Sequence, residues 1–433
     1  MKTSVLFRLT ILLAVWLPTS FALGLDNHPI ISEVFPLKKT PFNEVLPLPA
    51  EQISEKKWLE LKSKVLRDSN HRLSQPFHVS EELSERVGFW FDIYTRYGEE
   101  HHVIHHVRFP WIVFEVVDAR DVIQKSKGPL WLRKKRGEKL AKKRIQAIRS
   151  ALNQLARRKD YSNLPRLEKK IFDVLAKVPG DRKRVFKLAA NNLRSQLGQR
   201  DFFKRGLGNS GKYLTYMDEE FRRAGLPTEL TRMPFVESSF NERSYSKVGA
   251  SGIWQIMPAT GKAYMIVSKE IDERNSPLKA TQAAAKILRS YYKSLGSWPL
   301  AITAYNNGIG NIKKAIRHSN SKELDVIIDR YHQNDFRFAS SNFYTCFLAA
   351  LYAERYSELI FGKVPREPLK KREVIRLTKR TRADRLPSIT GFTQKVLLSY
   401  NLDLQGAFKT KAMIPAGYRL HVPSTVNQRV VQR

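Results

Sequence analysis

The sequence predicts a mainly α-helical protein that ends in a small α+β tail. Apolar residues recur at helical spacing in several segments, as in Val79–Arg96, where Ser80 is a suitable N-cap. The tail differs, because the strand-like run at 374–377 (VIRL) precedes a helix at 391–398. With 433 residues, of which 42% are hydrophobic, the chain is long enough to form two or three domains around buried cores.

The charge of the chain is strongly positive. It contains 76 Lys and Arg residues against 41 Asp and Glu residues, a formal net charge of +35 at pH 7. Such a surplus indicates an anionic partner or surroundings, which can be nucleic acid, lipid head groups or an acidic polymer. The single cysteine, Cys346, excludes an internal disulfide framework and is predicted to be a buried small hydrophobe in an apolar helix.

Residues 1–22 have the layout of a secretory signal peptide. Lys2 and Arg8 precede an apolar run at 9–17, and the small residues Ser20 and Ala22 suit cleavage after Ala22. The apolar run is short for a membrane span, and an uncleaved N-terminal anchor is the alternative. We therefore expect an exported protein of the periplasm or cell envelope, which disfavours nucleic acid as the partner and favours the cell wall. No cysteine lies near the cleavage site, so no lipid-anchor cysteine is expected there.

Residues 23–205 are predicted to form a basic, mainly helical N-terminal domain. Between 125 and 204 an apolar stripe runs beneath dense positive charge, so the helices would pack by one face and expose the basic face. The stripe consists of Leu140, Ile145, Ile148, Leu152 and Leu155. The basic face either is merely solvated or attracts the protein to anionic wall or membrane polymers.

Four histidines within 101–106 (HHVIHH) allow two interpretations. On a helix, histidines four apart would share a face, as in a metal site. The apolar residues between them and the run at 112–117 (IVFEVV) favour extended structure instead. We therefore predict strands here and no metal site.

Residues 206–362 are predicted to form the domain that carries the chemistry, beginning with a Gly-rich turn at 206–211. Thr228–Val236 is predicted to be a short helix that places Glu237 at its C-terminal end. Apolar neighbours such as Phe235 and Phe240 disfavour the ionised form of this carboxyl and can raise its pKa. General acid catalysis near neutral pH requires such a protonated acid.

Two further motifs follow Glu237 along the chain. A Gly-rich turn occupies 249–260 (GASGIWQIMPAT), and a Tyr-Asn-rich turn occupies 304–310 (AYNNGIG). The glycines permit tight backbone turns and a close approach of backbone to a ligand. Neither motif contains a second carboxylate.

In this order and spacing the three motifs resemble the lytic transglycosylases, lysozyme-like enzymes that cut the glycan strands of peptidoglycan. Within that family the chain most resembles the membrane-bound murein transglycosylase D type, over Leu214–Gly362. The resemblance implies a lysozyme-like catalytic domain in which one Glu acts first as acid and then as base. The base step closes a 1,6-anhydro ring on N-acetylmuramic acid (MurNAc) without consuming water. The lack of a second carboxylate in the two turns agrees with this, because glycoside hydrolases usually use two.

Carried over by motif, Glu237 is the expected catalytic acid and base. The expected substrate-binding residues are Ser246, Gln255, Met257, Tyr305, Asn306 and Tyr344. Tyr344 depends on the register, because many relatives have a Glu-Thr pair before this tyrosine and this chain has two serines, so Phe343 is the alternative. We prefer Tyr344, since a hydroxyl can hydrogen-bond to the acid and a phenyl ring cannot. No cofactor is implied.

After a linker at Pro365–Pro368, residues 373–425 resemble a degenerate LysM-like tail, a type that binds N-acetylglucosamine (GlcNAc) polymers in this family. Packing would explain the same residues, so glycan binding by this tail is left open. The sequence thus predicts a lytic transglycosylase that cleaves the MurNAc–GlcNAc β-1,4 bond of peptidoglycan glycan strands. The alternatives are a goose-type hydrolytic lysozyme and a non-catalytic peptidoglycan-binding protein.

Overall fold

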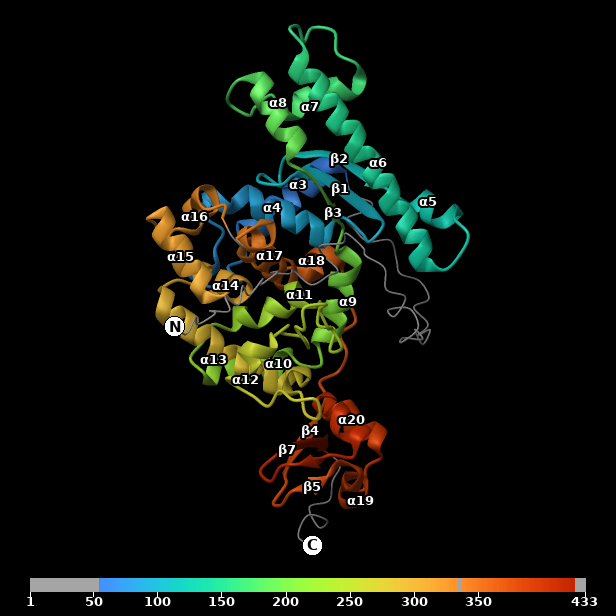
Figure 1. The fold of residues 1–433 in the computed structure, drawn as a ribbon, viewed down its shortest axis with the longest axis vertical. Helices are drawn as coiled ribbons and strands as arrows, with labels where there is room; N and C mark the ends of the chain where they lie inside the picture. Colours follow the sequence, from blue (N-terminus) through green and yellow to red (C-terminus); the bar gives the residue numbers. More distant parts are fainter. Residues whose placement is uncertain (1–53, 334–335, 425–433) are drawn as a thin grey trace, which may run out of the picture.

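The computed structural model describes residues 54–333 and 336–424 of the chain, so the predicted signal peptide lies outside the described residues. The molecule is elongated, with a central helical body, a helical extension at one end and a small tail at the other (Figure 1). Within the described ranges, no helix is long and apolar enough to cross a membrane.

The central body is built from helices that surround α17 (Phe338–Arg355). These helices are α3 (Glu55–Leu66), α4 (Glu81–Thr95), α9 (Arg200–Ser210), α10 (Leu214–Arg223), α11 (Met233–Glu237), α12 (Pro258–Lys262), α13 (Pro277–Leu295), α14 (Trp298–Asn307), α15 (Ile309–Ser319), α16 (Leu324–Arg330) and α18 (Ser357–Phe361), with short 3-10 turns η1 (Gln75–Phe77), η2 (Thr228–Arg232) and η3 (Glu273–Asn275). Helix α17 is buried without interruption from Asn342 to Glu354 and packs against α4, α11 and α14. An apolar helix without a polar face is expected at the centre of a core.

The main core crosses the predicted boundary between residues 205 and 206. Trp58, Trp90 and Tyr94 from the N-terminal segment belong to the same buried cluster as residues of the predicted catalytic domain. The predicted domain division itself stays a prediction, but α3 and α4 contribute directly to the packing of α17 and its neighbours.

The predicted turn at 206–211 is wrong, because residues 206–210 lie inside α9. Gly206 is buried in this helix, and a Cβ there would lie 3.1 Å from the backbone oxygen of Ser239 and 3.3 Å from the ring of Phe235. The glycine therefore permits close packing of α9 against the segment that follows α11, rather than a turn. A Gly-rich segment is compatible with a turn and with a close contact between helices, so the composition of 206–211 did not distinguish the two.

A three-stranded antiparallel sheet connects the central body to the helical extension. Its strands are β1 (His101–His106), β2 (Val113–Asp118) and β3 (Leu193–Leu197), in the order β2-β1-β3. The extended structure predicted around the histidines at 101–106 and in the run at 112–117 is confirmed. Strand β3 was not predicted, and it lies within the segment 125–204 that was expected to be helical. Among the described residues, no group of three or more His, Cys, Asp or Glu side chains is placed to hold a metal ion.

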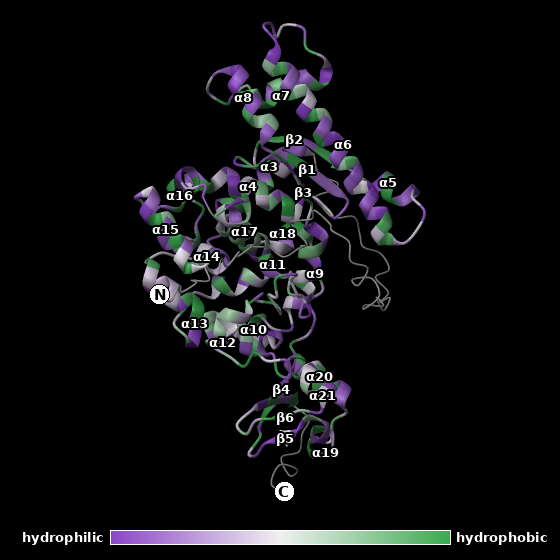
Figure 2. Cartoon of the chain, viewed as in Figure 1, coloured by the Kyte–Doolittle hydropathy of each residue, from purple (hydrophilic) through white to green (hydrophobic). Residues whose placement is uncertain are grey.

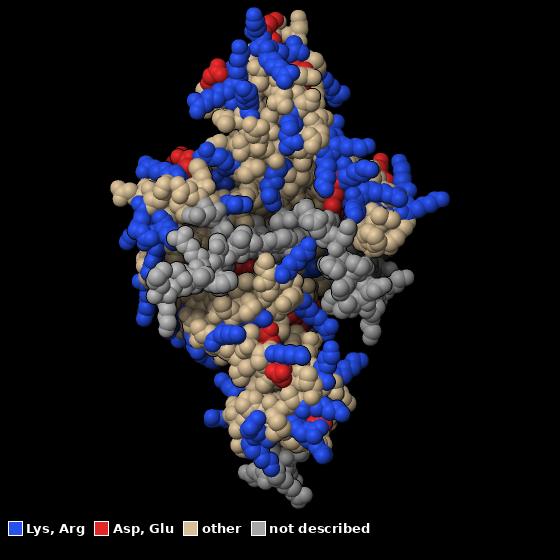
Figure 3. All heavy atoms as spheres, viewed as in Figure 1, with Lys and Arg blue, Asp and Glu red and all other residues tan. Residues whose placement is uncertain are grey.

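The helical extension consists of α5 (Arg120–Lys125), α6 (Leu130–Arg157), α7 (Arg166–Leu175) and α8 (Arg182–Asn191). A second core forms where α6, α7 and α8 meet one face of the sheet, and it contains the predicted stripe residues Ile148, Leu152 and Leu155. Hydrophobic and hydrophilic residues alternate along α6, as expected of an amphipathic helix (Figure 2). Lys and Arg side chains cover much of the visible face of this extension and also occur on the central body and the tail (Figure 3).

The tail has its own core and two small antiparallel sheets. Its elements are β4 (Arg372–Arg376), β5 (Thr381–Arg382), η4 (Ala383–Arg385), α19 (Leu386–Thr390), α20 (Gln394–Tyr400), η5 (Leu402–Leu404), α21 (Gln405–Thr410), β6 (Met413–Ile414) and β7 (Arg419–Pro423), with β4 paired to β7 and β5 to β6. The predicted strand and helix are confirmed as β4 and α20. The tail docks on the central body through Asp403, whose carboxylate accepts a hydrogen bond from Lys279 at 2.8 Å and whose backbone oxygen accepts one from the Asp272 N–H at 3.0 Å.

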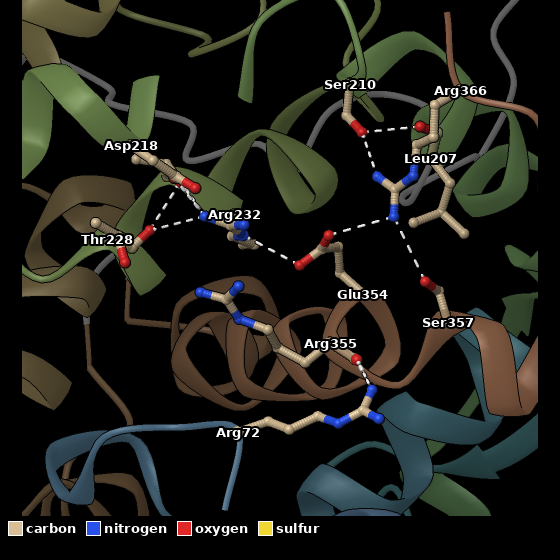
Figure 4. A network of polar contacts seen from close by, with 11 residues as sticks. Arg72, Leu207, Ser210, Asp218, Thr228, Arg232, Glu354, Arg355, Ser357 and Arg366 are labelled. Atoms are coloured by element: carbon tan, nitrogen blue, oxygen red, sulfur yellow. Dashed lines mark hydrogen bonds and ion pairs between the residues drawn. The ribbon is translucent and has the colours of Figure 1, made fainter. Parts of the chain in front are cut away.

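A buried ion network joins the segments around α17 (Figure 4). Arg232, directly before α11, donates from Nε to Glu354 of α17 at 3.1 Å and pairs with Asp218 of α10. Arg366 donates to the other carboxylate oxygen of Glu354 at 3.3 Å and to the Ser210 hydroxyl at 2.8 Å. Burial opposes ionisation of Glu354, but Arg232 and its other cationic neighbours lower the pKa of this carboxyl below its usual value.

We predict that Glu354→Gln lowers the free energy of unfolding by about 3 kcal/mol, the low end of the cost of breaking a buried ion pair, because Asp218 still neutralises Arg232. Urea unfolding at pH 7 measures the effect. The matched control is Glu358→Gln, a change at an exposed position on α18.

The same variant makes a prediction about pH. Because the folded-state pKa of Glu354 is lowered, its contribution to stability is present above the unfolded value of about 4.5 and is lost as pH falls through the folded value. The stability difference between wild type and Glu354→Gln should therefore shrink in acid. A difference that is constant down to pH 3 would contradict this role.

Candidate active site

Glu237 is the last residue of α11, which has only five residues. The helix ends sharply, because Ser239 and Phe240 both adopt positive φ, at 49° and 55°. The Phe240 N–H donates back to the Pro234 oxygen at 3.2 Å, and the Ser238 hydroxyl donates to the Ile253 oxygen at 2.9 Å. These bonds hold the end of α11, and therefore Glu237, next to the Gly-rich turn.

Glu237 is 5% exposed, and Tyr94 and Tyr305 lie within electrostatic reach of its carboxyl. Burial raises its pKa to about 8, because the ionised form would lose its hydration without gaining an opposite charge. The acid is therefore largely protonated at neutral pH, as the sequence analysis expected from its apolar neighbours.

Three acids that follow Glu237 in the sequence are paired elsewhere. Glu242 forms an ion pair with Lys212 at 3.2 Å, Asp272 with Arg274 at 2.7 Å and Glu273 with Lys279 at 2.9 Å. Each of these carboxylates already compensates a cation. Within the described residues, Glu237 is the acid that combines burial with a strongly raised pKa, which is the combination a general acid needs.

The Gly-rich turn is held by side chains inside it and next to it. Gly252 has φ of 74°, and a Cβ there would lie 2.0 Å from the Arg274 backbone oxygen, so this position requires glycine. Arg274 donates to the oxygens of Gly249 at 2.6 Å and Ile256 at 3.0 Å. Trp254 is fully buried and donates to the Thr281 hydroxyl at 2.9 Å, so it anchors the turn in the core.

Three predicted site residues lie on this turn or shortly before it. The Ser246 hydroxyl accepts from the Ala250 N–H at 2.8 Å and so braces the turn. Gln255 uses its side-chain Nε2 to donate to Gly252 at 2.8 Å and Ser244 at 3.1 Å, which leaves its Oε1 as an acceptor. Met257 is half-buried at the N-cap of α12.

The Tyr-Asn turn lies at the end of α14 and contacts the Gly-rich turn. Tyr305 donates its hydroxyl to the Trp254 oxygen at 2.9 Å, and its pKa is raised by burial and by the nearby Glu237. Asn306 accepts from the Ser340 hydroxyl at 3.2 Å, which connects the turn to the start of α17. Tyr305 is thus the predicted tyrosine whose hydroxyl lies within the electrostatic reach of the acid.

Tyr344 is buried on α17, where its ring stacks on Phe347 at a centroid distance of 6.3 Å. Its pKa is raised by burial and by Tyr352, eight residues further along the helix. At 3.6 residues per turn, Phe343 lies about 20° from Glu354 around α17 and Tyr344 about 80° from it. The role of Tyr344 stays a prediction, with Phe343, on the same stripe of α17 as Glu354, as the alternative.

Tyr94 of α4 is a site neighbour that the sequence analysis did not identify. It is buried, and its pKa is raised by burial, then by Cys346 and by Glu237. Its ring packs against Phe203 at 5.6 Å, and Phe203 in turn stacks on Phe235 of α11 at 4.8 Å. The available signal was a tyrosine on the apolar face of a predicted helix, where a hydroxyl needs a partner.

We predict that the carboxyl of Glu237 titrates near pH 8. Nuclear magnetic resonance of a chain carrying ¹³C-labelled glutamate carboxyls measures it, and Glu237→Gln assigns the resonance by its disappearance. Removal of the neighbouring ion-paired acid in Glu242→Gln serves as the control and should leave the titration unchanged. A midpoint near the ordinary glutamate value of about 4.3 would contradict the desolvation that the structure shows.

Comparison with known proteins supports this site. Residues 217–328 match the family model described as the transglycosylase SLT domain. A tributyltin chloride resistance protein of Alteromonas sp. (strain M-1) is 38% identical over 117 residues, which are 27% of this chain and 56% of that protein. Membrane-bound lytic murein transglycosylase D of Escherichia coli (strain K12) is 33% identical over 112 residues, 25% of each chain.

A solved structure, the 70 kDa soluble lytic transglycosylase of Escherichia coli, aligns with 72% of this chain and 55% of its own, with 16% identity and a TM-score of 0.28. The chain thus spans 56% and 25% of the lengths of the two curated relatives. The matched segment contains Glu237, the Gly-rich turn and the Tyr-Asn turn. The resemblance to lytic transglycosylases that these motifs predicted is confirmed for the segment that forms the site.

Proposed function

We propose that this protein is a lytic transglycosylase that cleaves the MurNAc–GlcNAc β-1,4 bond of peptidoglycan and leaves 1,6-anhydro-MurNAc ends, for cell-wall remodelling or turnover. The observation that carries the proposal is the buried Glu237 beside a glycine turn, with its pKa raised to about 8, while Glu242, Asp272 and Glu273 are ion-paired elsewhere. The match of residues 217–328 to the transglycosylase SLT domain supports it.

In the first step, Glu237 donates its proton to the glycosidic oxygen as the bond from that oxygen to C1 of MurNAc breaks. The GlcNAc hydroxyl leaves, and positive charge develops at C1 and the ring oxygen. A pKa of about 8 keeps the acid protonated before this step.

In the second step, the Glu237 carboxylate removes the proton from the C6 hydroxyl of the same MurNAc, and O6 bonds to C1. The acid regains its proton and no water is consumed. The desolvation that raises the pKa also makes the carboxylate a stronger base, so one environment serves both steps. The mechanism uses only side chains of this chain and requires no cofactor.

The turns would orient the sugar. Gln255 presents Oε1, which can accept from a sugar hydroxyl or an acetamido N–H. Tyr305 and Asn306 place a second polar edge beside it, and Met257 adds an apolar contact. Ser246 supports the Gly-rich turn from within. Tyr344 would contribute only if substrate reaches its side of α17.

We predict that the wild-type chain releases 1,6-anhydro products from purified sacculi, as measured by mass spectrometry. Glu237→Gln should lower the rate at least about a hundredfold, because the amide cannot deliver a proton. The matched control Glu242→Gln should retain most activity. Reducing ends in place of anhydro ends would indicate a goose-type hydrolase, and no cleavage at all would indicate a non-catalytic binding protein.

We also propose that the protein is exported and that its basic surface attracts it to anionic wall or membrane polymers. The exposed basic residues of α6 support this, because they occur on a helix whose opposite face is used for packing.

The LysM-like interpretation of the tail adds a second proposed contact, to GlcNAc-containing glycan. The antiparallel pairing of β4 with β7, with α19, α20 and α21 between them in the chain, is compatible with it.

We predict that replacing Arg136, Lys139, Lys142 and Lys143 of α6 by Gln weakens binding to sacculi and flattens its salt dependence. Exposed charges are screened beyond about 8–10 Å at physiological salt, so binding that depends on them should fall steeply as salt increases. Pull-down across a salt series measures this. The control replaces four exposed cations of the central body, Lys293, Lys313, Lys314 and Arg317. Equal effects of the two variants would show that α6 has no special role.

A further inference from the structure

A groove between the central body and the tail is lined by a mixture of Lys and Arg, other polar and apolar side chains. It comprises two adjoining cavities of about 500 Å³ and about 440 Å³, which share Lys279, Gln282 and Arg419. The walls come from α10 and α13 on one side, and from the linker, β4 and β7 on the other. Because Lys279 binds Asp403 of the tail, the docking contact itself forms part of the groove.

The cations of the groove differ in whether they are already compensated. Lys279 is neutralised by Glu273 at 2.9 Å and Asp403 at 2.8 Å. Arg419 and Lys371 line the larger cavity, are exposed, and form no ion pair within the described part of the chain. One acid, Glu219, lines the same cavity. Arg419 and Lys371 are therefore not neutralised by an ion pair within the described ranges.

Two nitrogen atoms of residues that line the first cavity are buried without a hydrogen-bond partner among the described residues. They are Nη2 of Arg372, on β4, and Nδ1 of His421, on β7. His421 is 7% exposed, and its pKa is lowered to about 4 by burial and by the neighbouring Lys279 and Arg372. Buried polar atoms normally have partners, so a ligand that accepts hydrogen bonds is the natural complement to these two.

The walls also include apolar side chains. Leu278, Leu369 and Val374 line the first cavity, and Met265 and Ile266 line the second. A compact inorganic anion would use neither the length nor these surfaces. An extended chain that combines carboxylates with small apolar side chains would use both.

We propose that this groove binds the carboxylates of the peptide chains that peptidoglycan carries on its MurNAc residues. The proposal rests on the proposed function, since it names which feature of that substrate the tail and the central body recognise together. Arg419 and Lys371 attract the carboxylate at the opening, and Arg372, together with the tautomer of His421 that is protonated on Nδ1, donates hydrogen bonds to it inside. The segment Tyr264–Ile266, which lines the second cavity, follows the Gly-rich turn by only a few residues, so the groove lies on the same domain as the acid.

The test measures binding to intact sacculi and to glycan strands from which an amidase has removed the peptides. All proteins carry Glu237→Gln, so the glycan is not cut during the measurement. The test variant adds Arg419→Gln and Lys371→Gln. The matched control adds Lys395→Gln and Lys409→Gln, two exposed tail cations that line neither cavity. Unfolding midpoints confirm that all variants fold.

We expect the test variant to bind peptide-bearing glycan about three- to tenfold more weakly than the control, from the loss of two exposed charge contacts. The two variants should bind peptide-free glycan equally. Equal loss on both glycans, or no difference from the control, would overturn the proposal. The proposal would also be overturned if inorganic phosphate displaced sacculi from the Glu237→Gln protein but not from the test variant. That result would identify the groove as a phosphate site. Cleavage by the wild-type chain, measured separately, tests the proposed function independently of these outcomes.

Discussion

The structure depends on the pairing of Arg232 with Glu354. Helix α11 is only five residues long, and an isolated helix of that length has no stability of its own. Its place is set at its start by Arg232, which reaches α17 and α10, and at its end by the hydrogen bonds of Ser238 and Phe240. Because Arg366 reaches the same carboxylate, the linker to the tail depends on this point as well. A buried charge is strongly destabilising when its partner is not in contact. The ion pair is therefore suited to holding α11 in one position.

Two buried glutamates near α17 have opposite pKa shifts. Glu354 is surrounded by arginines, and its pKa is lowered. Glu237, at the other end of α11, is buried with no neighbouring cation among the described residues that lowers its pKa, and this pKa is raised to about 8. Burial acts in the same direction on both, so the difference comes from the cations that one has and the other lacks. One glutamate maintains the fold as an anion, and the other is held in the neutral form that proton donation requires.

Positive charge has different uses in different parts of the molecule. In the interior, arginines such as Arg232 and Arg274 hold turns and helices through directed hydrogen bonds. On α6 the exposed cations act over longer distances and are screened by salt. The groove beside the tail is intermediate, because it combines exposed cations with buried donors. Net charge by itself does not distinguish these roles, since each depends on the local surroundings.

The sequence by itself determined the features that short segments encode. Helical periodicity, the strands around the histidines, the Glu237 position at a helix end and the two turns all depend on residues within about a dozen positions of one another. It missed β3, the helical Gly206 and Tyr94, because each depends on contacts with distant segments. Tertiary structure alone decided that Arg232 meets a residue 122 positions away and that the groove forms between tail and body. Packing around α17 brings distant segments of the chain together. A local sequence pattern does not indicate which buried polar groups will then be in contact.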